Sequence, residues 1–360
     1  GLARKRRAVE RALEVNRPDP GDPVDILCKV GGLDIAAMTG FYLGCAAAQV
    51  PVILDGDPGH DDAIAWMLAK ASPLLDIRGI TSVAGNQTIE KTTYNARRVA
   101  ALLGIDAPIA MGRPGPLLSD PITAGNIHGQ SGLDGPALPE PAVPLSDLSA
   151  VELMAKVLRE SEDKVVIIAT GPETNVAALL LAHPELKEKI AGISVMGGGI
   201  AYGNWTAAAE FNILVDPEAA EAVFGSGLPL QMCGLDVTEK ALIFPEDFQR
   251  IRAVGNQVSG IVADWLEFFY RFHREIGYAG APVHDPCAVA SLLRPELFTR
   301  QAMHVAIETQ GEYCRGYTVG DTSGKLGEDN AICCMNVDRQ GFADLLAEAV
   351  KFYDGREVPV

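Results

Sequence analysis

The chain has 360 residues, of which 48% are hydrophobic and 21% are charged, and its formal net charge is −17. This acidic balance excludes a nucleic-acid-binding protein, because neutralising phosphates requires a basic surface. The hydrophobic share is ample for a folded core and excludes a largely disordered chain.

Seven cysteines are scattered without a Cys-x-x-Cys spacing, which fits neither a disulfide framework nor a zinc site. The basic N-terminal segment lacks the apolar core and the cleavage site of a signal peptide. The most apolar stretch, residues 33–54, contains Asp34, Gln49 and Pro51, which argues against a membrane span and favours a buried helix followed by a strand. We therefore expect a cytoplasmic protein that does not enter a membrane.

From residue 50 onward, short apolar runs alternate with segments of helical period. The expected strands occupy residues 51–57, 77–85, 107–112, 164–171, 190–198 and 229–237. The expected helices occupy residues 61–71, 89–103, 148–160, 175–182, 217–224, 258–276 and 341–353. The alternation predicts an α/β fold with an open, mostly parallel sheet and helices on both faces. In such folds the loops at the carboxyl ends of the strands carry the chemistry.

The sequence DGDPGHDD, residues 55–62, stands where the first of these strands ends and a helix begins. It places Asp55, Asp57, Asp61 and Asp62 at one strand end, where their charges repel one another unless a cation is bound. Oxygen ligands alone favour a hard cation such as Ca²⁺ or Mg²⁺. Helix capping by an aspartate explains one or two of these residues, but not four. The cluster therefore predicts a metal site.

A second feature is AGAPVHDPCA, in which His284 and Asp285 precede another apolar helix. A histidine beside an aspartate at such a junction is typical of a capped helix start, and is also a candidate catalytic pair.

Further polar residues lie in apolar surroundings, and their side chains suit the recognition of hydroxyl groups in a sugar pocket. These residues are His128 in NIHGQSGLDG, and Asn204, Glu210 and Asn212 in GNWTAAAEFN. Because Asn and Gly also mark ordinary turns, each signal is weak by itself.

Taken in order, several stretches resemble the nucleoside hydrolase family over about residues 51–360. They are VILDGDPGHDDAIA, ITSVAGNQT, NIHGQSGLDGP, VIIATGPETNVA, VMGGG, GNWTAAAEFNILVDPEAA, GLDVT and APVHDPCAV. The resemblance implies an open parallel α/β core that binds Ca²⁺ and hydrolyses the N-glycosidic bond of ribonucleosides to ribose and free base. It also implies a small-molecule substrate and a homodimer or homotetramer.

The resemblance also implies a role for individual residues. Asp61 is expected to be the general base that takes a proton from a metal-bound water, His284 the acid that protonates the departing base, and Asp55 a supporting residue. The expected metal ligands are Asp57, Asp62, the backbone carbonyl of Thr170, and Asp285. The expected substrate contacts are Asn86, His128, Met196, Asn204, Glu210 and Asn212. A histidine that titrates near neutrality suits the acid role, because it can donate a proton and be recharged.

The N-terminal segment follows another pattern. Residues 1–56 resemble an internal piece of nicotinate-nucleotide dimethylbenzimidazole phosphoribosyltransferase, and the two resemblances meet at the strand sequence PVILDG. We expect a helical extension at residues 1–50 and a hydrolase domain at residues 51–360. A fusion at a shared strand and an error in assembling the sequence both explain the junction.

The base preference stays open at this point. Phe272 and Ile276 fall where we expect side chains that face the base, and Tyr278 or His273 could replace them after a local shift. Three other activities compete with the hydrolase: a catalytically impaired, Ca²⁺-stabilised ribose-binding domain; an aspartyl-phosphate phosphatase; and the phosphoribosyl transfer suggested by residues 1–56.

Overall fold

The computed structural model describes residues 11, 15–17, 49–125, 127 and 129–356. The chain divides into two units, Gly1–Gln49 and Val50–Val360, and the second is described below. The helix expected near residues 33–48 and the expected contact residue His128 lie outside the described residues.

In the described part of the chain, nine strands form one sheet in the order β10-β9-β11-β6-β5-β4-β1-β2-β3. Neighbouring strands from β3 to β11 run parallel, whereas β9 is antiparallel to both β11 and β10. The strands are β1 (Val50–Gly56), β2 (Leu75–Ser82), β3 (Ile109–Met111), β4 (Val165–Ala169), β5 (Ile190–Met196), β6 (Leu230–Cys233), β9 (Phe298–Ile307), β10 (Thr318–Asp321) and β11 (Ala331–Val337). The expected open, mostly parallel sheet is confirmed.

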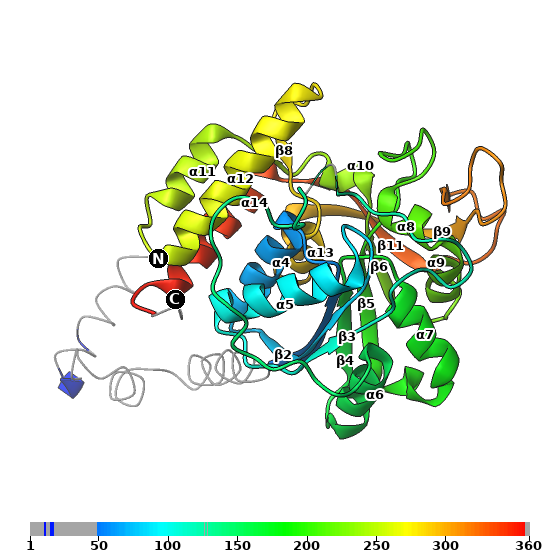
Figure 1. Cartoon of the computed structure of the whole chain (residues 1–360), viewed down its shortest axis with the longest axis horizontal. Helices are drawn as coiled ribbons and strands as arrows, with labels where there is room; N and C mark the ends of the chain where they lie inside the picture. The colour runs from blue at the N-terminus through cyan, green and yellow to red at the C-terminus, as the bar shows by residue number, and fades with distance from the viewer. Residues whose placement is uncertain (1–10, 12–14, 18–48, 126, 128, 357–360) are drawn as a thin grey trace. The chain divides into compact units, whose positions relative to one another are not determined.

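Helices cover both faces of the sheet because the central strands are apolar on both faces. In β1, Val52 and Leu54 enter one apolar core and Ile53 enters the other. Around the first core lie α4 (His60–Ala71), α5 (Ile89–Leu103), α11 (Pro245–Arg252), α12 (Gln257–Glu275), α13 (Pro286–Leu293) and α14 (Arg339–Ala349). Around the second lie α6 (Ala150–Glu160), α7 (Thr174–Ala182) and α9 (Pro217–Phe224). Figure 1 shows α4 and α12 on one side and α6 and α7 on the other.

Several expected elements differ from the structure by a few residues at their ends, and two differ in kind as well. The strand expected at 229–237 is wrong beyond Cys233, because Leu235 donates its N–H to the carbonyl of Gly198 and a short helix, α10 (Leu235–Thr238), begins there. The helix expected at 341–353 begins at Arg339, where the Asp338 side chain caps it, and passes into a 3₁₀ turn, η3 (Val350–Tyr353). Apolar periodicity does not detect such capping and turn contacts.

The order of the strands positions the functional site. After β1 the chain forms β2 and β3 on one side, and then returns to place β4 on the other side of β1. The carboxyl ends of β1 and β4 therefore border a topological switch point, where open α/β sheets bind their ligands.

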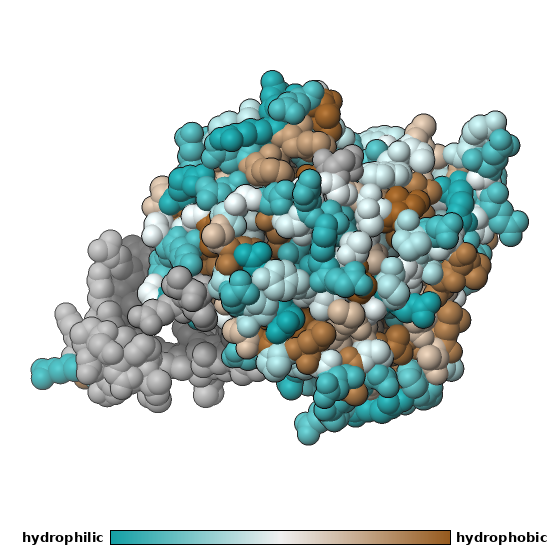
Figure 2. Space-filling view, in the orientation of Figure 1, coloured by the Kyte–Doolittle hydropathy of each residue, from teal (hydrophilic) through white to brown (hydrophobic). Residues whose placement is uncertain are grey.

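The surface agrees with the acidic composition. On the face in Figure 2, hydrophilic side chains predominate, and apolar side chains form small separate patches. Among the residues that the structure describes, no helix is both long enough and apolar enough to cross a membrane.

Candidate active site

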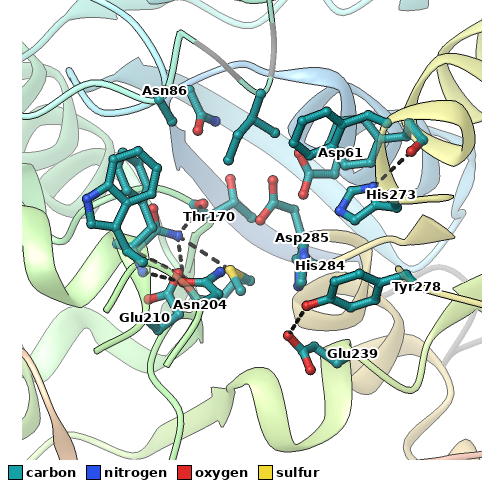
Figure 3. Close-up of a pocket in the computed structure, with 18 of the residues that line it drawn as sticks. Asp61, Asn86, Thr170, Asn204, Glu210, Glu239, His273, Tyr278, His284 and Asp285 are labelled. Atoms are coloured by element: carbon teal, nitrogen blue, oxygen red, sulfur yellow. Dashed lines mark hydrogen bonds between the residues drawn. The ribbon is translucent and has the colours of Figure 1, made fainter. Parts of the chain in front are cut away.

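A cavity of about 400 Å³ contains most of the residues that the sequence singled out (Figure 3). Nine of them line it: Asp61, Asn86, Thr170, Met196, Asn204, Glu210, Asn212, His284 and Asp285. They come from segments far apart in the chain, and the strand ends and the turns that follow them bring the segments together.

Of the four aspartates in the first acidic motif, Asp61 lines the cavity and the other three do not. Asp55, Asp57 and Asp62 are completely buried. Asp55 Oδ1 accepts hydrogen bonds from Thr81 Oγ1 at 2.6 Å and Asn175 Nδ2 at 2.8 Å. Burial raises the pKa of Asp55 to about 7. Its position fits the supporting role expected of it.

The position of Asp55 also argues against the phosphatase alternative. A nucleophilic aspartate must reach its phosphate substrate, but Asp55 is buried, holds two hydrogen bonds and is not among the cavity-lining residues. The surrounding carboxylates would also repel a phosphate group.

Asp57 does not line the cavity and is held in place by the turn after β2. Its Oδ2 accepts the N–H of Asn86 at 2.6 Å, while its Oδ1 is buried without a hydrogen-bond partner. Gly171, after β4, lies against this carboxylate, because a Cβ there would stand 2.7 Å from Asp57 Oδ1. An unpartnered buried carboxylate oxygen is costly, so this atom is suited to binding a cation.

Asp61, Asp62 and Asp285 form a buried acidic cluster, with one oxygen from each lying within 4.8 Å of the others. Burial, with the nearby charge of Asp62, raises the pKa of Asp61 to about 7. Burial raises the pKa of Asp62 to about 6. Burial and the charges of Asp61 and Asp62 raise the pKa of Asp285 well above its usual value.

These residues fit a metal ion. Asp57 Oδ1 has no partner, three further carboxylates converge, and no Lys or Arg from the described residues lines the cavity. A cation is the partner that would offset the repulsion among these groups. Since all the available donors are oxygen atoms, a hard cation is favoured.

A second wall of the cavity consists of side chains that hold one another in place. Glu210 caps α8 (Phe211–Val215), accepting the N–H groups of Asn212 and Ile213, and also accepts the N–H of Gly198 at 2.9 Å. Asn212 donates from Nδ2 to the carbonyls of Thr170 at 3.1 Å and Met196 at 3.0 Å. These hydrogen bonds restrict the side chains of Glu210 and Asn212, because each of them bonds to more than one segment of the chain.

His284 is held by Thr238, the last residue of α10, through a 2.8 Å hydrogen bond between Nδ1 and Oγ1. Burial, with a smaller effect of His273, lowers the pKa of His284 to about 3. The expectation of a group titrating near neutrality is therefore wrong, because the protein around the ring disfavours the imidazolium. The ring is neutral at physiological pH, and it donates only through an N–H.

The structure adds cavity residues that the sequence did not single out. Glu239, directly after Thr238, and Trp205 both line the cavity. Glu239 directly follows the stretch GLDVT, and this position is the sequence feature that could have identified it as a cavity residue. The four residues left open for the base, Phe272, His273, Ile276 and Tyr278, all line the cavity.

Comparisons with known proteins agree with this geometry. A family model described as inosine-uridine preferring nucleoside hydrolase matches residues 52–344, and one described as phosphoribosyltransferase matches residues 1–73. Both resemblances seen in the sequence are thereby confirmed. The chain belongs to the inosine-uridine preferring nucleoside hydrolase family, whose members are enzymes that hydrolyse the N-glycosidic bond of ribonucleosides.

Particular relatives support the assignment. The chain is 58% identical over 308 residues to the pyrimidine-specific ribonucleoside hydrolase RihA of Escherichia coli O127:H6, covering 84% of this chain and 99% of the relative. The solved structure of a purine-preferring ribonucleoside hydrolase from Gardnerella vaginalis matches with a TM-score of 0.78 at 30% identity, over 84% of this chain and 98% of that one. A plant nucleoside hydrolase, PpNRh1, matches with a TM-score of 0.77 at 29% identity, over 84% and 99%.

Proposed function

We propose that this enzyme hydrolyses pyrimidine ribonucleosides to ribose and free base, and that it requires Ca²⁺. The observation that supports this most strongly is the cavity, where a buried acidic cluster faces amide and aromatic side chains. The relatives at 58% identity, which are named as pyrimidine-specific, support the choice of base.

Asp57, Asp62, Asp285 and the carbonyl oxygen of Thr170 would hold the ion. The Thr170 carbonyl accepts from Asn212 Nδ2, and a carbonyl oxygen has a second lone pair for a cation. When bound, Ca²⁺ would supply positive charge that holds ribose hydroxyls and lowers the pKa of water.

Asp61 is the proposed general base. It lines the cavity among carboxylates, so its side chain can take a proton as a water oxygen attacks the anomeric carbon. The bond from that carbon to the base nitrogen breaks, and the base needs one proton. The proton that Asp61 takes from water therefore balances the net reaction.

The amide wall orients the ribose. Asn212 Nδ2 binds two carbonyls, which leaves Asn212 Oδ1 to accept from a hydroxyl. Asn204 Oδ1 accepts from the N–H of Phe211 at 3.0 Å, which leaves its Nδ2 to donate. Asn86, Met196 and Glu210 complete this wall, and negative or amide oxygens there favour the positive charge that develops on the ribosyl group.

His284 assists the departure of the base. In this proposal Thr238 Oγ1 donates its hydrogen bond to His284 Nδ1, which places the ring N–H on Nε2, from which it can donate to the base as negative charge develops there. The His284 acid role is thus a hydrogen-bond donation by a neutral ring.

The experiment that tests the proposal is ribose release from uridine, cytidine, inosine, adenosine and nicotinamide riboside, with and without a calcium chelator. We expect release from the pyrimidine nucleosides, its loss with chelator and its return on adding Ca²⁺. A folded protein, loaded with Ca²⁺, that releases ribose from none of them would favour the impaired ribose-binding domain instead.

An oligomeric state and a cellular location can also be proposed for the enzyme. We propose a homodimer or homotetramer, as the family resemblance implies, which light scattering on the purified full chain would measure. We also propose a cytoplasmic location, which the free thiols of Cys233, Cys287, Cys314, Cys333 and Cys334 support.

A further inference from the structure

A carboxylate that the proposed mechanism does not use lies at the end of the cavity near His284. Glu239 lines the cavity one residue after Thr238, which holds His284. Among the described residues, no Lys, Arg or His forms an ion pair with Glu239. A carboxylate that faces a ligand cavity without a cationic partner is suited to accept hydrogen bonds from the ligand.

Tyr278 determines whether this end of the cavity offers hydrogen-bond donors or acceptors. Its hydroxyl donates to Glu239 Oε1 at 2.7 Å, and both residues line the cavity (Figure 3). A phenol has one O–H proton. While Glu239 takes that proton, the Tyr278 oxygen can only accept from a ligand. Glu239 and Tyr278 therefore present two acceptors side by side and no donor.

A second tyrosine near the same carboxylate offers the ligand no donor. Burial, together with the nearby Glu239, raises the pKa of Tyr202 to about 12, so Tyr202 stays protonated. Tyr202 is not among the residues that line the cavity, so its hydroxyl does not change the donors and acceptors that Glu239 and Tyr278 present.

The surroundings define which part of a nucleoside meets this acceptor pair. His284, which is proposed to contact the base, Tyr278 and Glu239 follow one another in Figure 3, on the side away from Asp61. The aromatic residues Phe269 and Phe272 line the same cavity and suit a flat base. The pair therefore faces the edge of the base rather than the ribose.

Pyrimidine bases differ at that edge. Cytosine carries an exocyclic amino group with two N–H donors, which one pair of acceptors can satisfy together. Uracil has one N–H between two carbonyl oxygens, so two adjacent acceptors would place at least one of them against a carbonyl. An unpaired or repelled polar group in a closed site costs binding energy.

We infer that Glu239 and Tyr278 recognise the exocyclic amino group of the base, so that this enzyme prefers cytidine to uridine. This inference rests on the proposed pyrimidine ribonucleoside hydrolase function. It makes Glu239 a specificity residue and Tyr278 its partner.

The test compares kcat/KM for cytidine and uridine in the full-length, Ca²⁺-loaded enzyme and in Glu239→Gln. We expect the wild type to favour cytidine by about tenfold or more, as for one well-placed hydrogen bond. In Glu239→Gln, the amide adds a donor and releases the Tyr278 proton, so the ratio should fall to about one or reverse. Glu162→Gln changes an exposed carboxylate outside the cavity and should keep the wild-type ratio.

A second variant separates the loss of base recognition from misfolding of the first variant. Tyr278→Phe keeps the ring and should also lower the preference for cytidine. In the double variant, the cytidine to uridine ratio should fall no further than in the more affected single variant, because the two groups act as one pair. The inference is overturned if the wild type prefers uridine, or if both variants melt normally and keep the wild-type ratio. In either case, ribose release still supports the proposed function. No release from any nucleoside by the wild type overturns the function itself.

Discussion

At one end of the cavity, Asp61 comes from the first turn of α4, which follows β1, and Thr170 comes from the turn after β4. At the other end, His284, Tyr278 and Glu239 come from irregular segments after α12 and β6. The first end depends on neighbouring parallel strands, whose carboxyl ends must meet at one edge. The second depends on a hydrogen bond between residues 39 positions apart, Tyr278 and Glu239. Sheet topology thus brings the proposed catalytic residues together, whereas side-chain contacts between separate segments hold the residues that we propose select the base.

The largest expected effect tests the acidic end. Asp61→Asn should lower turnover by about 10²- to 10⁴-fold, the usual contribution of a general base, while keeping bound calcium, because Asp61 is proposed as a base rather than a ligand. Ribose release and elemental calcium analysis measure the two properties. Asp163→Asn, at an exposed position, is the matched control. Loss of calcium along with turnover would make Asp61 a ligand instead.

The next effect tests the base end. His284→Ala should lower kcat/KM for pyrimidine nucleosides by about 10²-fold, since one donor to the departing base is lost. The loss should be smaller for 4-nitrophenyl riboside, whose leaving group needs less assistance. Steady-state rates on the two substrates measure the difference, and equal losses on both would contradict the donor role.

Removal of the metal should destabilise the acidic end in a pH-dependent way. Burial raises the pKa values of Asp55 and Asp61 to about 7 and of Asp62 to about 6. The folded, chelated protein then binds more protons than the unfolded chain, so its stability falls as pH rises from about 4 to 7. Bound Ca²⁺ favours the ionised forms and opposes this fall.

Calorimetry across pH 5 to 8 measures this prediction. A calcium concentration a thousandfold above its Kd adds about 4 kcal/mol, which corresponds to roughly 6 °C in melting temperature for a domain of this size. We expect the difference between calcium-loaded and chelated protein to widen with pH. A gap that is constant with pH would show that these carboxylates do not carry the linkage.

The smallest effect is expected at a position outside both ends of the cavity, and it serves as a stability reference. Ser149 caps α6, and its Oγ accepts the N–H of Glu152. Ser149→Ala should cost about 1 kcal/mol of unfolding free energy, measured by urea denaturation, and leave the cytidine to uridine ratio unchanged. A changed ratio would show that substrate choice responds to stability in general.

The sequence predicted the regular parts of the fold well. The helices expected at 89–103 and 217–224 have the bounds of α5 and α9, because apolar periodicity reports the face that a helix buries. The strand expected beyond Cys233 failed, because a contact between Leu235 and Gly198, far along the chain, ends the strand. Periodicity contains no information on such contacts.

The sequence by itself determined the acidic motif at the end of β1, the family of the chain and most of the residues that line the cavity, because short motifs and apolar periods are local properties. Only the tertiary structure decided that His284 is a neutral ring held by Thr238, that Asp57 keeps an unpartnered buried oxygen, and that Glu239 faces the cavity bound to Tyr278. The physical reason is that burial and hydrogen-bond partners are set by segments distant in sequence. The pKa, the tautomer and the donor or acceptor character of a side chain follow from those neighbours.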